Sequence, residues 1–112
     1  MTPGALAGVK VLEFSEMIAA PFAGLHLGDL GADIIKIEPP TGESWRLTNP
    51  FAPTESRVFL ALNRNKRDLA VDLKSDAGRE IVHRLVPAMD VVLVNYRPDT
   101  PTKLGIEEEI GR

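Results

Sequence analysis

Short apolar runs alternate with polar stretches rich in glycine and proline along most of the chain. The runs at residues 9–14, 33–38, 69–73 and 90–94 are dominated by Val, Ile, Leu and Phe. Strands that are covered on both faces of a parallel sheet have this almost continuous apolar pattern. The sequence therefore predicts a strand at each of these positions.

Two segments between these runs have helical spacing of apolar residues. In residues 21–30, Pro21 suits the first turn of a helix and Gly31 suits the position after its end. In the second segment, Ser75 is a favourable N-cap, and the apolar spacing continues up to Pro87. We predict one helix in each segment.

The predicted order is strand, helix, strand, loop, strand, helix, strand. Alternation of this kind is typical of an α/β fold with a parallel sheet, so we expect an open sheet of about four strands with flanking helices. The long loop at 39–57 is rich in Pro, Gly, Ser and Thr, and the type of the short apolar element at 58–62 is left open. With 112 residues, the chain has the length of one domain, residues 1–112.

Gly24 and Gly28 lie four residues apart, on one face of the first predicted helix. A glycine inside a helix costs about 1 kcal/mol relative to alanine, so both glycines should serve packing. We expect this face of the helix to approach either the sheet or a partner chain closely.

Composition narrows the classes of function. The net charge of −3 gives no reason to expect nucleic acid as a partner, and the absence of cysteine excludes disulfides and thiolate chemistry. His26 and His83 are far apart and form no metal-ligand pattern, so no metal is expected. Neither a signal peptide nor an apolar run of the ~18 residues that span a bilayer is present, so we expect a cytoplasmic protein with no membrane partner.

Ligands of open α/β sheets bind at the carboxyl ends of the strands. That rule selects residues 15–20, the segment from Pro39 onward, residues 72–75 and residues 95–97. The phosphate-binding pattern G-x-x-x-x-G-K-[ST] is missing, and the glycines at 24, 28 and 31 do not form G-x-G-x-x-G. A dinucleotide site is therefore not favoured.

Four stretches of the chain are similar to the N-terminal part of the class III CoA-transferases, the CaiB/BaiF family. They are Gly8–Phe14; Ala20–Ala23 with Leu30–Glu38; Asn63–Arg67 with Val71–Lys74; and Asp90–Pro98. Their order and spacing match across nearly the whole chain, which makes the resemblance specific.

The resemblance implies a Rossmann-like open sheet that forms an incomplete part of the family's large domain. Members of the family move coenzyme A (CoA) between carboxylic acids through an aspartyl anhydride, or racemise acyl-CoA thioesters, and they form interlocked dimers. The residues that carry this chemistry lie downstream of the region matched here, so we assign no catalytic residue. The implied ligands are CoA thioesters and small carboxylic acids. The implied protein partner is a second copy or a complementing C-terminal part.

The resemblance also implies a set of CoA-binding positions. Met17, Ile18 and Ala19 match the segment at the thioester end, and Val71 and Lys74 match a pair near the adenine and phosphates. Further matches are Asn95, Tyr96 and Arg97 near the adenosine and Lys103 near a phosphate. The alternative for Lys74 is an ordinary surface lysine, and the alternative for Tyr96 is partial burial in the core instead of stacking on the adenine.

Four residues stand out by charge without indicating a site. Arg64, Lys66 and Arg67 most simply form a solvated basic turn, and the single carboxylate of Glu13 is weak evidence for acid–base chemistry. Alternatives to the transferase are a racemase fragment and a non-catalytic remnant that binds nucleotide or oligomerises. A receiver-type signalling domain, which needs clustered carboxylates, is disfavoured.

Overall fold

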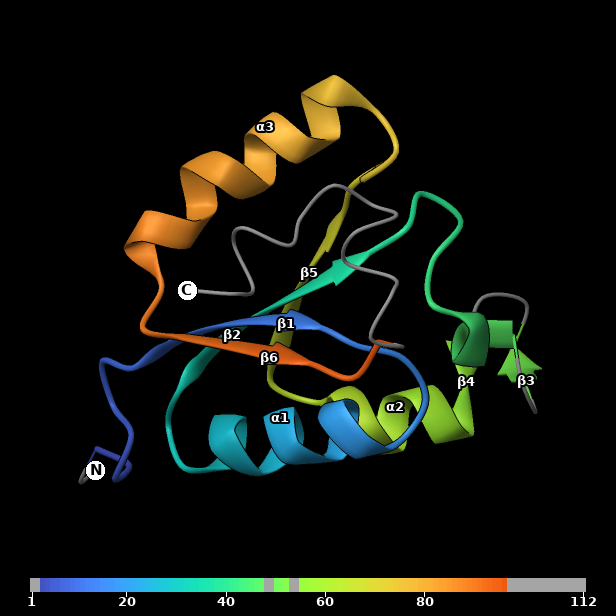
Figure 1. Cartoon of the computed structure of the whole chain (residues 1–112). Coiled ribbons are helices and arrows are strands. Elements are labelled where there is room, and N and C mark those ends of the chain that lie inside the picture. Colours follow the sequence, from blue (N-terminus) through green and yellow to red (C-terminus); the bar gives the residue numbers. More distant parts are fainter. Residues whose placement is uncertain (1–2, 48–49, 53–54, 97–112) are drawn as a thin grey trace.

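A computed structural model describes residues 3–47, 50–52 and 55–96 (Figure 1). Its main sheet has four strands in the order β5-β2-β1-β6, and every neighbouring pair is parallel. The strands are β1 (Lys10–Phe14), β2 (Asp33–Glu38), β5 (Lys66–Ala70) and β6 (Val91–Val94); the helices are α1 (Ala19–Asp29), α2 (Arg57–Asn63) and α3 (Asp76–Leu85). The predicted α/β fold with a parallel sheet is confirmed.

Helices lie on both faces of the sheet. Figure 1 shows α1 and α2 on one face and α3 on the other. Because side chains alternate along a strand, Leu12 and Phe14 of β1 join the core under α3, together with Val82 of that helix. Val11 faces the opposite way and packs with Ile34 beside Leu27 of α1. Within the described ranges, no helix is long and apolar enough to cross a membrane.

The third strand begins earlier than the sequence predicted. Strand β5 covers Lys66–Ala70, whereas the apolar run suggested 69–73. Val71 and Leu73 are apolar because they are buried in the core under α3 after the strand has ended. Lys66 and Asp68 are polar although they pair with β2, because both side chains take part in ion pairs.

The segment expected to be a long loop contains short regular elements. These are a 3₁₀ turn (Ser44–Leu47), the paired strands β3 (Pro50–Ala52) and β4 (Glu55–Ser56), and then α2. Ser56 caps α2 by accepting a hydrogen bond from the backbone N–H of Phe59. The apolar element of undecided type at 58–62 is therefore helical.

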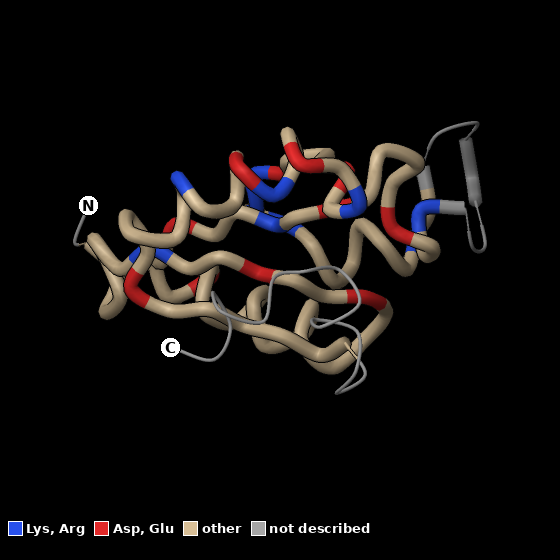
Figure 2. Tube along the Cα trace, turned by 45° about the horizontal axis from the view of Figure 1, so that its top comes forward, with Lys and Arg blue, Asp and Glu red and all other residues tan. Residues whose placement is uncertain are grey.

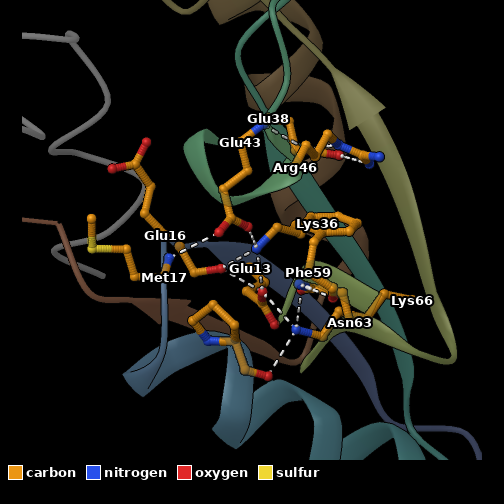
Figure 3. A network of polar contacts seen from close by, with 12 residues as sticks. Glu13, Glu16, Met17, Lys36, Glu38, Glu43, Arg46, Phe59, Asn63 and Lys66 are labelled. Atoms are coloured by element: carbon orange, nitrogen blue, oxygen red, sulfur yellow. Dashed lines mark hydrogen bonds and ion pairs between the residues drawn. The ribbon is translucent and has the colours of Figure 1, made fainter. Parts of the chain in front are cut away.

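A group of buried charges lies between the sheet and the α1–α2 layer (Figure 3). Glu13 of β1 pairs directly with Lys36 of β2 in the sheet register, and Lys36 Nζ lies 3.2 Å from Glu13 Oε2. Lys66 Nζ reaches the same oxygen from β5 at 3.0 Å. The hydroxyl of Ser15 donates to Glu13, and Glu43 Oε2 lies 2.6 Å from Lys36 Nζ. We call these five residues the Lys36 cluster.

Pairing makes these buried charges tolerable. The charged side chains of the Lys36 cluster have no exposed surface, and an unpaired ion there would cost several kcal/mol. Burial lowers the pKa of Lys66, although the adjacent Glu13 carboxylate opposes the shift.

Gly24 gives the Glu13 carboxylate room beneath α1. A Cβ at Gly24 would lie 1.9 Å from Glu13 Oε1 and 3.2 Å from Lys66 Cε. A Cβ at Gly28 would meet Ile34 Cγ1 at 3.4 Å, which is an ordinary contact. The close approach expected from the two glycines is therefore to the sheet, and Gly24 is the residue that requires it.

The carboxyl end of β2 is fixed by a partly buried ion pair. Arg46 Nε lies 2.6 Å from Glu38 Oε1, and the guanidinium sits 4.0 Å above the ring of Phe59. Burial alone would raise the pKa of Glu38, but the hydrogen bonds from Arg46 and from the Glu43 backbone outweigh it. The pKa therefore lies below its usual range.

We expect Gly24→Ala to destabilise the protein by about 1–3 kcal/mol, because Glu13 is held by Lys36 and Lys66 and cannot move aside. Gly28→Ala is the matched control, and it should be neutral or stabilising by up to about 1 kcal/mol. Urea unfolding measures both variants. Equal stabilities of the two variants would contradict the packing described for Glu13.

We expect Arg46→Met to lower the free energy of unfolding at about pH 7 by about 1–3 kcal/mol, because a buried carboxylate loses its cation. The pKa of Glu38 in the folded protein lies below the reference value of 4.5. Its charge therefore stabilises the fold above that value, and the contribution is lost as the pH falls through the folded pKa. The difference between wild type and variant should shrink on acidification.

Thermal unfolding at several pH values measures this difference. Arg84→Met is the control, because Arg84 forms an exposed pair with Glu80 that should contribute less than about 1 kcal/mol. A difference between wild type and Arg46→Met that stays constant down to about pH 2.5 would show that Glu38 does not depend on Arg46.

Candidate functional site

A cleft of about 630 Å³ opens at the carboxyl ends of the parallel strands. Its walls come from the carboxyl end of β2 and from the segments after the strands of the main sheet: residues 16–19, 37–40, 71–74 and 95–96. These are the segments in which the sequence placed a ligand. The topology explains why they meet, because parallel strands end at the same edge of a sheet. We call this feature the carboxyl-end cleft.

The loop between β1 and α1 (residues 15–18) forms one wall of the cleft, and the end of β6 holds it. The Asn95 side-chain oxygen accepts from Glu16 N–H at 2.9 Å, and its Nδ2 donates to Glu16 O at 2.8 Å. Asn95 lines the cleft, but its amide is already engaged with this backbone. The residue therefore shapes the wall whether or not it also contacts a ligand.

The loop is held from its other side by Glu43. Met17 has φ 62°, a left-handed conformation that is unfavourable for a non-glycine residue. Its backbone N–H donates to Glu43 Oε1 at 2.9 Å (Figure 3). The side chains of Met17 and Ile18 are half exposed and face the cleft.

The structure brings together most residues that the resemblance implied for CoA binding. The described ones all line the carboxyl-end cleft: Met17, Ile18, Ala19, Val71, Lys74, Asn95 and Tyr96. Arg97 and Lys103 lie outside the described residues. Contact between any of these side chains and CoA stays a prediction.

Lys74 supplies a positive charge at the rim of the cleft. It follows β5 in the turn that leads to α3, and its backbone N–H is held by Asp72 Oδ1 at 3.0 Å. Ser75 caps α3 by accepting from Gly78 N–H. Within the described part of the chain, the Lys74 ammonium has no ion-pair partner. It is thus available for an anionic ligand.

Tyr96 is partly buried at the opposite wall. Its ring meets the ring of Phe14 edge to face, with centroids 6.4 Å apart. Burial, followed by the nearby carboxylate of Glu16, raises the pKa of Tyr96 above its usual range, so the phenol keeps its proton. Partial core burial is therefore observed, while stacking on a purine remains a prediction.

The basic turn at Arg64, Lys66 and Arg67 is only partly solvated. Arg64 pairs with Asp29 at 2.7 Å and Arg67 with Asp33 at 2.6 Å, both on the surface. Lys66 is different, because its side chain is buried against Glu13. The expected solvated role was wrong for Lys66, since it balances a carboxylate inside the fold.

Sequence reasoning missed the residues that position the loop wall. Glu43 and Lys36 were not singled out, and Glu13 was considered only as a candidate acid. A signal was present, because Glu13 and Lys36 interrupt otherwise apolar strands, where a charge requires a partner. Glu43 lies in a polar loop, and nothing in its local sequence distinguishes it.

The described site has features of a binding cleft. No group of three or more His, Cys, Asp or Glu side chains that could hold a metal occurs in the described ranges. Figure 2 shows basic and acidic residues interspersed along the trace. The lining combines apolar side chains with Lys74 and the carboxylates of Glu16 and Asp72.

Comparison with known proteins gives consistent relatives. The family model for CoA-transferase family III matches residues 6–112. Human succinyl-CoA:glutarate CoA-transferase is 42% identical over 106 residues, which cover 93% of this chain and 24% of that protein. Cinnamoyl-CoA:phenyllactate CoA-transferase of Clostridium sporogenes is 37% identical over 108 residues, which cover 92% of this chain and 26% of that protein.

Solved structures agree with the fold. A CaiB/BaiF family protein of Brucella suis superposes with a TM-score of 0.88 at 36% identity, covering 97% of this chain and 30% of that one. A hypothetical protein of Mycobacterium tuberculosis superposes with a TM-score of 0.84 at 40% identity, covering 94% of this chain and 29% of that one. The chain thus spans about a quarter to a third of the length of these relatives. On the family match and these relatives together, the chain belongs to CoA-transferase family III.

Proposed function

We propose that the carboxyl-end cleft binds the CoA moiety of an acyl-CoA thioester. The observation that carries the proposal is the convergence of Ile18, Val71 and Asn95, from three distant segments, on one cleft. A cavity of about 630 Å³ is within the range of ordinary small-molecule sites. CoA has a pantetheine arm that can pack on apolar surface and a nucleotide that is anionic. Its cleft therefore needs both apolar surface and positive charge.

The lining of the cleft provides both apolar surface and positive charge. Met17 and Ile18 offer apolar surface to the pantetheine and thioester, whereas Lys74 offers a cation to a phosphate. Glu38 lies at the cleft but is neutralised by Arg46, so its charge does not repel a phosphate strongly. Asp72 and Glu16 are acidic neighbours, which limits the affinity that Lys74 alone can provide.

We further propose that the protein acts in moving CoA between carboxylic acids. The relatives compared above are named as CoA-transferases, which favours transfer over racemisation. In the family, an aspartate downstream of the region matched here forms the mixed anhydride. The proposal therefore assigns binding, and no catalytic residue, to this chain.

Self-association belongs to the same proposal. Both outer strands, β5 and β6, have an edge unpaired by any other described strand, and several large apolar side chains are exposed. They include Phe22 and Leu30 on and just after α1, Leu60 on α2, Ile81 on α3 and Val91 on β6. Such surfaces favour contact with a second copy or with a complementing C-terminal part.

We expect the purified chain to bind CoA in isothermal titration calorimetry. Lys74→Met should weaken this binding by about twofold to tenfold, because a charge-assisted contact is lost at an exposed site. Lys10→Met is the control with the same change of charge. Lys10 begins β1 and therefore lies at the amino-terminal ends of the strands, away from the carboxyl-end cleft.

Dephospho-CoA sharpens the test, because it lacks the phosphate on the ribose. If Lys74 meets that phosphate, Lys74→Met should weaken the binding of CoA but not that of dephospho-CoA. A folded sample that produces no heat with CoA would refute the proposed function. Equal losses in Lys74→Met and Lys10→Met would refute the role of Lys74.

A further inference from the structure

The backbone at Met17 has a left-handed conformation that its neighbours must stabilise. A left-handed non-glycine residue is strained and persists only where its surroundings enforce it. Here Asn95 holds the peptide groups of Glu16, and Glu43 holds the N–H of Met17. The hydrogen bonds of Asn95 and of Glu43 reach the loop at residues 15–18 from opposite sides.

Glu43 is itself fixed at several atoms. Its side chain has no exposed surface, and its Oε2 lies 2.6 Å from the ammonium of Lys36. Its backbone N–H donates to Glu38 Oε1 at 2.9 Å. The Lys36 ammonium is fixed in turn by Glu13 and Ser15. The position of Met17 N–H is thus set by charges that are buried in the sheet.

Glu43 is not part of the cleft lining, whereas Met17, Ile18 and Ala19 are. Its side chain therefore acts on this wall of the cleft through the Met17 backbone that it holds. We propose that Glu43 is a positioning residue that, by fixing the Met17 N–H, sets the cleft wall that meets the acyl-thioester end of bound CoA. This inference rests on the proposed function of the cleft.

The proposal has a consequence that a general loss of stability would not produce. If CoA lies as proposed, its thioester end meets the wall at residues 16–19, whereas Val71 and Lys74 line another segment of the cleft. Loosening the Glu43 contact should therefore weaken binding of the acyl-pantetheine part selectively. The nucleotide part should bind as before.

The test uses Glu43→Gln, because glutamine keeps the shape but replaces one carboxylate oxygen by an NH2 donor. The two atoms that face Met17 N–H and Lys36 Nζ can then no longer both accept. Glu43→Asp is the second variant. It keeps the charge beside Lys36 but is too short for both contacts, so it provides a folded sample if the buried amide does not. Glu80→Gln on α3 is the matched control, since Glu80 is exposed and pairs with Arg84 on the surface.

Two readouts are measured on each variant. Hydrogen exchange of the Met17 amide, followed by NMR, should become faster by about tenfold or more in Glu43→Gln and Glu43→Asp and stay unchanged in Glu80→Gln. Affinity for butyryl-CoA should fall by about tenfold, whereas affinity for adenosine 3′,5′-bisphosphate, the nucleotide part of CoA, should change by less than about twofold.

The outcomes separate the two proposals. Unchanged Met17 exchange, or equal weakening of both ligands, would overturn the role of Glu43. Failure of the wild-type chain to bind either ligand would overturn the proposed function and, with it, the role of Glu43 in CoA binding. Binding of both ligands to wild type with no selective loss in the Glu43 variants would overturn the positioning role alone.

Discussion

The structure depends on the neutralisation of a lysine buried in the middle of its sheet. Lys36 has no exposed side-chain surface, and an ammonium in that position is costly unless it is paired. Glu13 from the neighbouring strand and Glu43 from the following loop supply the pairing, and Lys66 balances the second negative charge. Each partner lies on a different element. Satisfying the charges therefore fixes β1, β5 and the segment after β2 relative to one another.

This requirement reaches the cleft through a short chain of contacts. Gly24 leaves space for Glu13 under α1, Glu13 and Glu43 hold Lys36, and Glu43 holds Met17 at the cleft wall. Buried ion pairs are rarely the most stable way to fill a core, because hydrophobic residues of similar volume often serve as well. An ionic core here has a use that a hydrophobic one would lack, since only a polar acceptor can hold the Met17 N–H.

Sequence patterns predicted the sheet well because apolar runs and helix caps are local signals. Strand β2 was predicted at its observed bounds, and the ends of the strands identified the cleft. The start of β5 was missed because Lys66 is polar for an ionic reason and Val71 is apolar for a packing reason. Glu43 could not be found from its neighbours in sequence. Its role arises from contacts with Met17, 26 positions away, and with Lys36 in the preceding strand, and these contacts exist only in the folded protein.

The most direct test of the account is a crystal structure of this chain with CoA bound. We expect the adenosine beside residues 71–74 and 95–96 and the pantetheine thiol near residues 17–19, with the hydrogen bond between Glu43 and the Met17 N–H retained. CoA bound at the amino-terminal edge of the sheet, or a carboxyl-end cleft left empty while CoA binds elsewhere, would contradict the account.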